Sequence, residues 1–274
     1  MSENGRDGAY APIEAWFRSY VDEFRGADGA LPGPLEFKLA HSARVAENSS
    51  LIAAGLGLPG GEAALARAAG LLHDAGRFTQ YAGHGSFIDA RSLDHGLEGR
   101  RVLEEKARPL FSCGAAFGRL LCAVQYHNRK AEDLPSGLPP ADNSLLLLVR
   151  DADKLDIMNG LIGSVETDGF KGLQVMVPDI ALSRELSPGV LEAAARGETL
   201  ALKDLHTLAD IMVMVAGWFK DLNYTPARQA ASDRGFLSRL RRQLPESQGL
   251  DALFSSLAKT EAQPGRKYIG DVDS

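Results

Sequence analysis

Cysteine is scarce in this chain of 274 residues, which holds only Cys113 and Cys122 and no Cys-x-x-Cys pair. We therefore expect neither a disulfide framework nor a cysteine zinc site. Long apolar runs are also absent, since the longest, 145–149 and 211–219, are far shorter than the roughly 18 residues of a membrane span. The first residues are polar and lack the apolar stretch of a secretory signal. These absences predict a soluble, cytoplasmic protein with reduced thiols.

Basic charge is not in excess, because 30 Lys and Arg residues oppose 36 Asp and Glu residues, for a net charge of −6. An extended nucleic-acid surface normally needs a basic face, so we expect none. A local basic pocket for a small anionic substrate remains compatible with this balance. The chain is 45% hydrophobic and 24% charged, which is the composition of a globular protein with a substantial core.

Helical periodicity dominates the chain, and the alternation typical of β-strands is almost absent. The segment 61–74 is rich in Ala and Leu nearly all round, which indicates a helix in the centre of a bundle. The segment 76–92, with Gly83 and Gly85, is expected to be irregular, and the tail 264–274 to be frayed. The other predicted helices are 13–24, 37–54, 94–107, 115–127, 143–158, 188–196, 202–222, 235–244 and 250–259.

This pattern predicts one all-α domain over 1–274. Its core, at 35–160, carries the polar residues described next, and a helical C-terminal extension, 161–274, is expected to pack on that core. The helix 202–222 has a stripe of Met and aromatic residues. Such a stripe more often packs into a core than forms a dimer face, although a homodimer remains open.

The pair His73-Asp74 ends the most apolar predicted helix. Burying an ionised carboxylate without a partner costs several kcal/mol at least, so another group must compensate. A metal ion bound by both side chains would do so. A hydrogen-bonded core pair is the alternative, and for an isolated His-Asp dipeptide it is the simpler interpretation.

Further His and Asp residues occur where periodicity predicts a buried helix face. His41, His127 and Asp153 lie on the inward stripes of their helices, and His95 opens a helix directly after Asp94. Each of them alone could be a satisfied core group or a cap. Five helices that each direct a His or Asp inward indicate a shared cation instead. Imidazole and carboxylate ligands without thiolate suit Mn, Fe, Co, Ni, Zn or Mg.

These residues resemble the HD superfamily of metal-dependent phosphohydrolases, whose pattern is a His, later a His-Asp pair, and later still an Asp near the end of a helix. The matching segments are His41-Ser-Ala-Arg-Val45, Leu71-Leu-His-Asp-Ala-Gly-Arg77 and Asp151-Ala-Asp-Lys-Leu-Asp156. The resemblance covers roughly 38–157. It implies an HD-domain-like helical bundle with a metal at its centre.

The resemblance also implies a ligand set. The first metal would be held by His41, His73, Asp74 and Asp153. The segments Gly76-Arg-Phe-Thr-Gln80, Asp94-His95 and Tyr126-His-Asn128 are similar to a subgroup with additional histidines. In that subgroup a second metal lies beside the first, which here would be held by Asp74, His95 and His127. The additional histidines could contact a phosphate instead, so one or two divalent ions are expected.

A divalent cation with open positions activates water and polarises a phosphoryl oxygen, so phosphoester hydrolysis is the expected reaction. The expected substrate is a nucleotide or another small phosphorylated molecule. Asp74 and Arg77 are the predicted catalytic residues, and Lys38 is expected to be an ordinary surface charge. Asp94 is expected either to orient a ligand imidazole or to cap its helix. The predicted substrate-binding residues are Arg77, Lys154, Arg44 and Asn128.

Two other functions remain open at this point. Some HD-fold proteins use an iron pair on similar ligands, so a di-iron oxygenase is the second enzymatic interpretation. The third is a nucleotide-binding sensor module without turnover. The complete set of potential ligands argues against this last interpretation.

Overall fold

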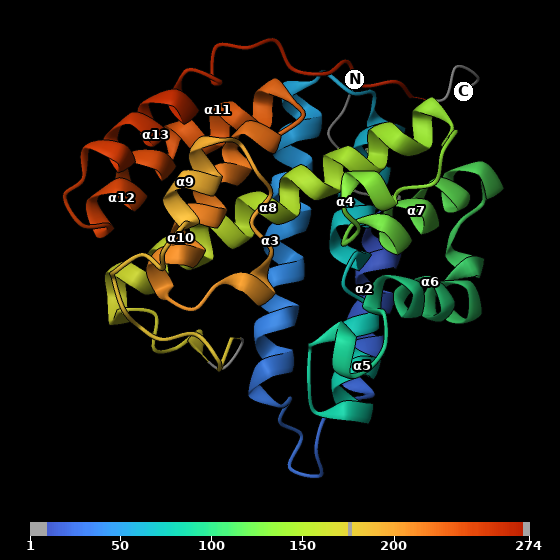
Figure 1. The fold of residues 1–274 in the computed structure, drawn as a ribbon. Coiled ribbons are helices and arrows are strands. Elements are labelled where there is room, and N and C mark those ends of the chain that lie inside the picture. The colour runs from blue at the N-terminus through green and yellow to red at the C-terminus, as the bar shows by residue number, and fades with distance from the viewer. Residues whose placement is uncertain (1–9, 175–176, 271–274) are drawn as a thin grey trace. The chain divides into compact units, whose positions relative to one another are not determined.

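The structure of this chain is a computed structural model that describes residues 10–174 and 177–270. The prediction of an all-α fold is confirmed (Figure 1). Within the described residues the only β-type pairing is an isolated bridge between Ala181 and Thr207. The same part of the chain has no helix that combines the length and the apolar character of a membrane span.

Contacts along the chain divide it into two compact units. The first comprises 1–153 with 267–274, and the second comprises 154–266. The predicted single domain with a core at 35–160 stays a prediction. The first unit contains α2 (Ala11–Asp22), α3 (Gly33–Gly55), α4 (Gly60–Leu72), α5 (Gly76–His84), α6 (His95–Lys106), α7 (Gly114–Tyr126), the first part of α8 (Pro140–Asp168), and the short helices η1 (Asp89–Arg91), η2 (Arg108–Leu110) and η3 (Ala131–Asp133).

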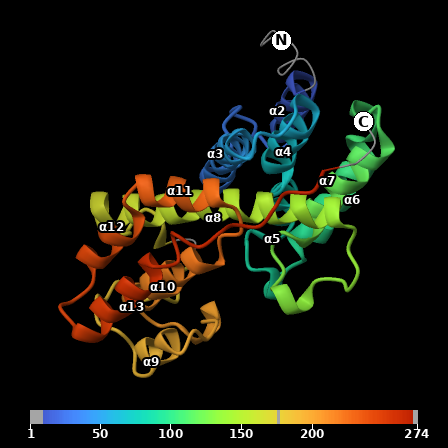
Figure 2. The ribbon, with the colours of Figure 1, turned by 90° about the horizontal axis from the view of Figure 1, so that it is seen from above.

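The centre of the first unit is the pair α3 and α4, which lie side by side in Figures 1 and 2. The residues of α4 that face its neighbours are mostly Ala and Leu, and they are buried, as its composition predicts. At Gly70 a Cβ would lie 2.3 Å from Ser49 Oγ and 3.0 Å from Val45 O. The absence of a side chain at Gly70 therefore sets the short distance between these two helices.

A second close approach joins α5 to α6. A Cβ at Gly76 would lie 2.2 Å from His95 O and 2.5 Å from Gly99 N, both of which are backbone atoms. Backbone cannot move aside as a side chain tip can, so only glycine fits there. This contact brings the start of α6, which is His95, against the residues that follow α4.

We expect Gly76→Ala to destabilise the protein by about 2 kcal/mol or more, because the added methyl must push α6 away. Gly83→Ala is the matched control, since Gly83 lies in the same helix and a Cβ there has nothing within 4 Å. That control should be neutral or up to about 1 kcal/mol stabilising. Chemical denaturation of the two variants measures the difference. Equal stabilities would show that the α5–α6 contact is not tight.

The expectation of an irregular segment at 76–92 is wrong for its first half, which forms α5. Gly85 ends this helix in the left-handed conformation with φ of 62°, so the glycine marks a helix end rather than a loop. The tail 264–274, expected to be frayed, is held where it is described: Tyr268 Oη donates to Glu62 Oε2 at 2.8 Å. Ile269 N donates to Ser144 Oγ at 3.0 Å. The end of the tail, 271–274, lies outside the described residues.

The predicted helix 202–222 is interrupted, because Thr207 and Asp210 form a capping box that starts a new helix. Asp210 is buried and also accepts hydrogen bonds from Ser187 N and Oγ, at 2.8 and 2.6 Å. The second unit contains the rest of α8, η5 (Leu202–Asp204), η6 (Trp218–Asp221), α9 (Val190–Ala195), α10 (Leu208–Gly217), α11 (Thr225–Asp233), α12 (Phe236–Gln243) and α13 (Gln248–Ala258). The sequence prediction missed α11, which has a proline in its first turn.

Candidate metal centre

Six imidazole and carboxylate side chains meet inside the first unit. They come from the middle of α3, the turn after α4, the first residue of α6, the residue after α7, and the middle of α8. All are buried except Asp153, whose side chain is 19% exposed. They are the six predicted ligands: His41, His73, Asp74, His95, His127 and Asp153. The structure brings all of them together, and their binding of metal remains a prediction.

The first cluster consists of His41, His73, Asp74 and Asp153. Nε2 of His41 lies 3.2 Å from Nε2 of His73 and 3.1 Å from Oδ1 of Asp153. Oδ2 of Asp74 lies 3.6 Å from each of these imidazole nitrogens. A cation with bonds of about 2.0–2.2 Å holds neighbouring ligand atoms roughly 3–3.6 Å apart. The spacing of His41, His73 and Asp74 therefore fits one metal ion, and Asp153 lies beside the two imidazoles.

The chemistry of these atoms also fits a cation. Nδ1 of His73 lies 2.8 Å from the carbonyl oxygen of Gly70, so Nδ1 carries the proton and Nε2 directs a lone pair into the cluster. Oδ1 of Asp153 is buried there and accepts no hydrogen bond. Acceptor atoms that face one another at 3.6 Å repel unless a positive charge lies between them. The chemistry of these atoms is thus that of a cation-binding set.

The second cluster uses the other oxygen of Asp74. Oδ1 lies 3.5 Å from Nε2 of His95 and 3.6 Å from Nε2 of His127, and the two imidazole nitrogens are 3.1 Å apart. Nδ1 of His127 donates to Val124 O at 2.8 Å, so its Nε2 is also free to bind a metal. One buried carboxylate therefore serves two clusters, with one oxygen facing each.

Asp74 and His95 each have the charge state that metal binding needs at neutral pH. Burial alone would raise the pKa of Asp74, but the Lys38 ammonium holds this pKa well below its usual range. Burial lowers the pKa of His95 to about 4, although its hydrogen bond to Asp89 opposes this shift. Asp74 is therefore an anion and His95 a neutral ligand.

Asp89 orients His95, a role that the sequence had left open for Asp94. Oδ2 of Asp89, in η1, accepts a 2.6 Å hydrogen bond from Nδ1 of His95. Asp94 instead caps α6, because its Oδ1 accepts hydrogen bonds from Gly96 N and Leu97 N. No sequence pattern marks Asp89, which lies in an aperiodic segment six residues before His95.

We expect Asp89→Asn to weaken metal binding at the second cluster by about 10- to 100-fold, because the imidazole loses the carboxylate that fixes its tautomer and orientation. Asp94→Asn is the matched control, since Asn also caps helices well and Asp94 does not hold the imidazole. Titration of both metal-free variants with Mn²⁺ measures the effect. Equal affinities in the two variants would contradict the role of Asp89.

Two cations flank Asp74. Nζ of Lys38 lies 2.7 Å from Oδ2, and Nε of Arg77 lies 3.5 Å from Oδ1. The expectation that Lys38 is a surface charge is wrong, because Lys38 is 9% exposed and paired with a buried carboxylate. Its position three residues before His41 on α3 places both side chains on one face of the helix.

Arg77 makes its hydrogen bonds through one nitrogen, Nη1. Its Nη1 donates to Gln80 Oε1, Phe87 O and Asp89 Oδ1, at 2.8, 2.6 and 2.9 Å. Its Nε is buried and donates to no acceptor. The Nε–Nη2 edge therefore lies beside Asp74 without a hydrogen-bond acceptor among the described residues.

The other predicted substrate-binding residues are placed less directly. Asn128 donates to Asp89 Oδ2 and Asp94 Oδ1, both at 3.3 Å, so it lies near the second cluster. Arg44 is exposed on α3. Lys154 belongs to the second unit, where its Nζ donates to Asp221 O at 3.4 Å. The substrate contacts of these residues stay predictions.

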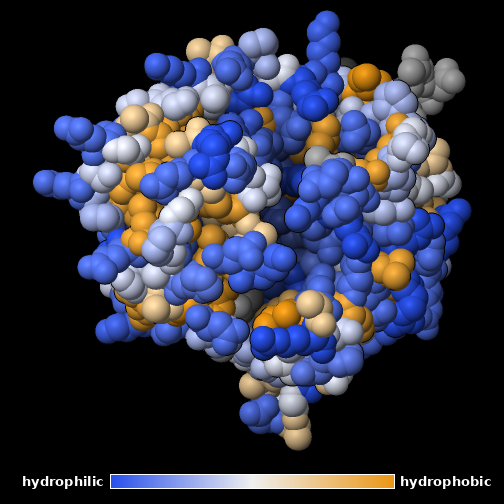
Figure 3. Space-filling model, in the orientation of Figure 1, coloured by the Kyte–Doolittle hydropathy of each residue, from blue (hydrophilic) through white to orange (hydrophobic). Residues whose placement is uncertain are grey.

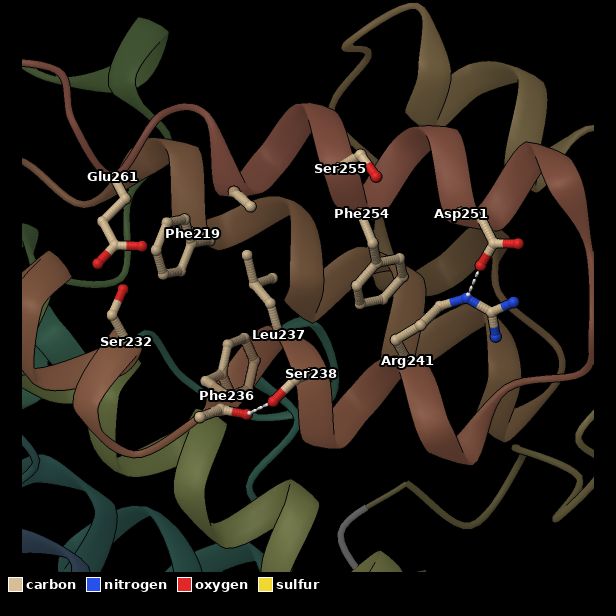
Figure 4. Close-up of a pocket in the computed structure, with 12 residues that line it drawn as sticks. Phe219, Ser232, Phe236, Leu237, Ser238, Arg241, Asp251, Phe254, Ser255 and Glu261 are labelled. Atoms are coloured by element: carbon tan, nitrogen blue, oxygen red, sulfur yellow. Dashed lines mark hydrogen bonds and ion pairs between the residues drawn. The ribbon is translucent and has the colours of Figure 1, made fainter.

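A pocket in the second unit is lined by other types of residue than the two His/Asp clusters. Figure 4 shows one of about 390 Å³, in which Phe219, Phe236 and Phe254 are among the lining residues and Arg241 is neutralised by Asp251 at 2.8 Å. On the face in Figure 3, apolar residues gather over the helices of this unit. This pocket has no histidine among its lining residues, so it lacks the metal-binding chemistry of the first unit.

A comparison with family models matches residues 39–158 to the HD domain. Neither the curated proteins nor the solved structures include a match to this chain. The matched range contains all six clustered residues.

Proposed function

This chain is a member of the HD superfamily, and on that premise we propose that it is a metal-dependent phosphohydrolase that cleaves a phosphoester of a nucleotide or another small phosphorylated molecule. The observation that carries the proposal is the pair of clusters on the two oxygens of buried Asp74. Divalent cations bound there would supply an activated water and would polarise a phosphoryl oxygen.

Each clustered residue is assigned to one or both metal sites by its position. His41, His73 and Asp153 would hold the first cation, and His95 and His127 would hold the second. Asp74 would contribute one carboxylate oxygen to each. Because Asp89 and the carbonyls of Gly70 and Val124 fix three of the imidazoles, little reorganisation is needed when the cations bind.

The Nε–Nη2 edge of Arg77, which lacks a hydrogen-bond acceptor, supports an oxyanion as substrate. A guanidinium edge with two parallel N–H groups matches two oxygens of a phosphoryl group. The Nη1 contacts hold this edge in place before substrate binds. Ordering the Arg77 side chain therefore costs little further entropy when substrate binds. Arg77 is therefore proposed to bind the phosphoryl group and to stabilise its charge during the reaction.

The test begins with elemental analysis of the purified protein. The protein is then loaded with Mn²⁺, Co²⁺, Ni²⁺ or Mg²⁺ and assayed on phosphatase and phosphodiesterase substrates, with Asp74→Ala protein in parallel to detect contaminating activity. We expect phosphate or nucleoside release from the wild type alone. No release with any metal, from protein shown to contain it, would refute the proposal.

A di-iron oxygenase is the second candidate, because four imidazoles and two carboxylates also suit iron. The observation that favours it is the same pair of clusters, with two imidazoles in each. Oxygen consumption by iron-loaded protein, without phosphate release, would select this candidate over the hydrolase.

A further inference from the structure

Lys38 has an unusual position for a lysine beside a metal centre. Its Nζ hydrogen-bonds Asp74 Oδ2 at 2.7 Å, and among the described residues it has no other hydrogen-bond partner. Its remaining close neighbour is the ring of Phe87, whose centre is 5.7 Å away. The ammonium is thus committed to the oxygen that faces His41 and His73.

A cation in the first cluster would need that same oxygen. With a bond of about 2.1 Å to Oδ2, the cation would lie less than about 5 Å from Nζ. Two positive charges at this distance in a buried site repel strongly. Lys38 must therefore weaken the binding of a cation that it does not touch.

Lys38 has the opposite effect when the first cluster holds no cation. Asp74 is buried, and the Lys38 ammonium is a direct counter-charge at 2.7 Å from its Oδ2. Without Lys38, Oδ2 of this buried carboxylate would face the two imidazole nitrogens of His41 and His73 with no direct counter-charge. The same contact therefore stabilises the metal-free protein.

The two clusters differ in the protein cation that lies beside their oxygen of Asp74. On the Oδ1 side the nearest protein cation is Arg77, whose Nε lies 3.5 Å away and makes no hydrogen bond. The first cluster contains the carboxylates of Asp74 and Asp153, whereas the second contains only that of Asp74. By charge alone, the first cluster would therefore bind a cation more tightly than the second. Lys38 acts on the first cluster and reduces that difference.

We propose that Lys38 is an internal counter-ion of the metal centre, which competes with the cation of the first cluster for Asp74 Oδ2. It keeps the metal-free centre folded and keeps that cation exchangeable. Lys38 is a positioning residue in this role, since it acts through Asp74. The inference rests on the metal centre of the proposed function and not on the reaction catalysed there.

The test compares Lys38→Met with Lys38→Arg and the wild type. Met keeps the length of the side chain and removes its charge, whereas Arg keeps the charge. Lys106→Met is the matched control, because Lys106 also pairs with a carboxylate, Glu23, at 2.6 Å, but lies at the far end of α6 from His95. Metal-free protein is titrated with Mn²⁺, and the rate of Mn²⁺ extraction by EDTA is measured on loaded protein.

We expect Lys38→Met to bind its tightest Mn²⁺ at least about tenfold more strongly and to release it more slowly. Metal-free Lys38→Met should unfold at a lower temperature than the wild type, while Lys38→Arg and Lys106→Met should bind Mn²⁺ within about threefold of the wild type. Equal or weaker binding by Lys38→Met would overturn the inference, because Lys38 would then support Asp74 as a ligand or have no effect.

If Lys38→Met does not fold without metal, it can be purified with Mn²⁺ and judged by EDTA extraction alone. Slower extraction than from the wild type supports competition, and equal or faster extraction refutes it. Neither measurement involves turnover. A protein that binds Mn²⁺ as expected but hydrolyses nothing would contradict the proposed reaction and leave the role of Lys38 intact.

Discussion

Asp74→Ala should remove both the bound metal and the catalytic activity. The substitution takes one ligand from each cluster, because Asp74 directs Oδ2 towards His41 and His73 and Oδ1 towards His95 and His127. No other carboxylate among the described residues faces both clusters. We expect activity to fall at least about a thousandfold, since no activated water remains.

The variant also leaves Lys38 as a buried charge without its partner. Breaking a buried ion pair from one side costs about 3–5 kcal/mol, so part of the protein could unfold for a reason unrelated to the metal. Asp74→Asn keeps the shape of the side chain and separates the two effects. Asp22→Ala is the control for a lost ion pair, because Asp22 pairs with Arg25 at the surface.

The measurements are elemental analysis after dialysis, circular dichroism, and an assay on the phosphoester that the wild type hydrolyses. Folded Asp74→Asn protein without metal and without activity is the expected result. Asp22→Ala should match the wild type in all three measurements. Activity that survives in folded Asp74→Ala or Asp74→Asn protein would mean that the catalytic centre lies elsewhere.

His41, His127 and Asp153 were predicted because each violates a simple rule, and the complete ligand set was implied by the resemblance to the HD superfamily. A His or Asp on the apolar stripe of a helix is costly unless something compensates it, and periodicity alone reveals which face is apolar. His41 and Asp153 are visible in this way. Periodicity also located the helices that carry them, since α3 and α7 differ from the predicted ranges only at their ends.

The surroundings of the centre could not be predicted in the same way. The side chain of Asp89 matters because η1 folds back onto the start of α6, and no periodic pattern marks such a contact. Lys38 was expected at the surface because nothing in α3 indicates that Asp74, 36 residues later, lies behind it. The role of Tyr268 depends on a contact with Glu62 across 206 residues. Long-range pairs of this kind are set by tertiary packing and not by local propensity.

The second large effect is expected for Arg77→Met. We expect kcat/KM for a phosphoester to fall at least about 100-fold, because the open Nε–Nη2 edge is lost from its place beside Asp74. Inhibition by inorganic phosphate should weaken by at least about tenfold for the same reason. Arg77→Lys should restore little, since an ammonium cannot present two parallel N–H groups.

Arg77 also holds the segment that carries Asp89, so its loss could act through His95 instead of through the substrate. Gln80→Leu separates the two effects, because Gln80 Nε2 donates to Asp89 Oδ1, Ser92 Oγ and Leu93 O and so binds the same segment. That variant loosens the segment and removes one of the three acceptors of Arg77 Nη1, but Phe87 O and Asp89 Oδ1 still hold the guanidinium. If Arg77 binds the phosphoryl group, Gln80→Leu should lower Mn²⁺ affinity yet keep inhibition by phosphate close to that of the wild type. Equal losses of phosphate inhibition in both variants would show that Arg77 only positions Asp89, and the oxyanion would then be bound by other residues.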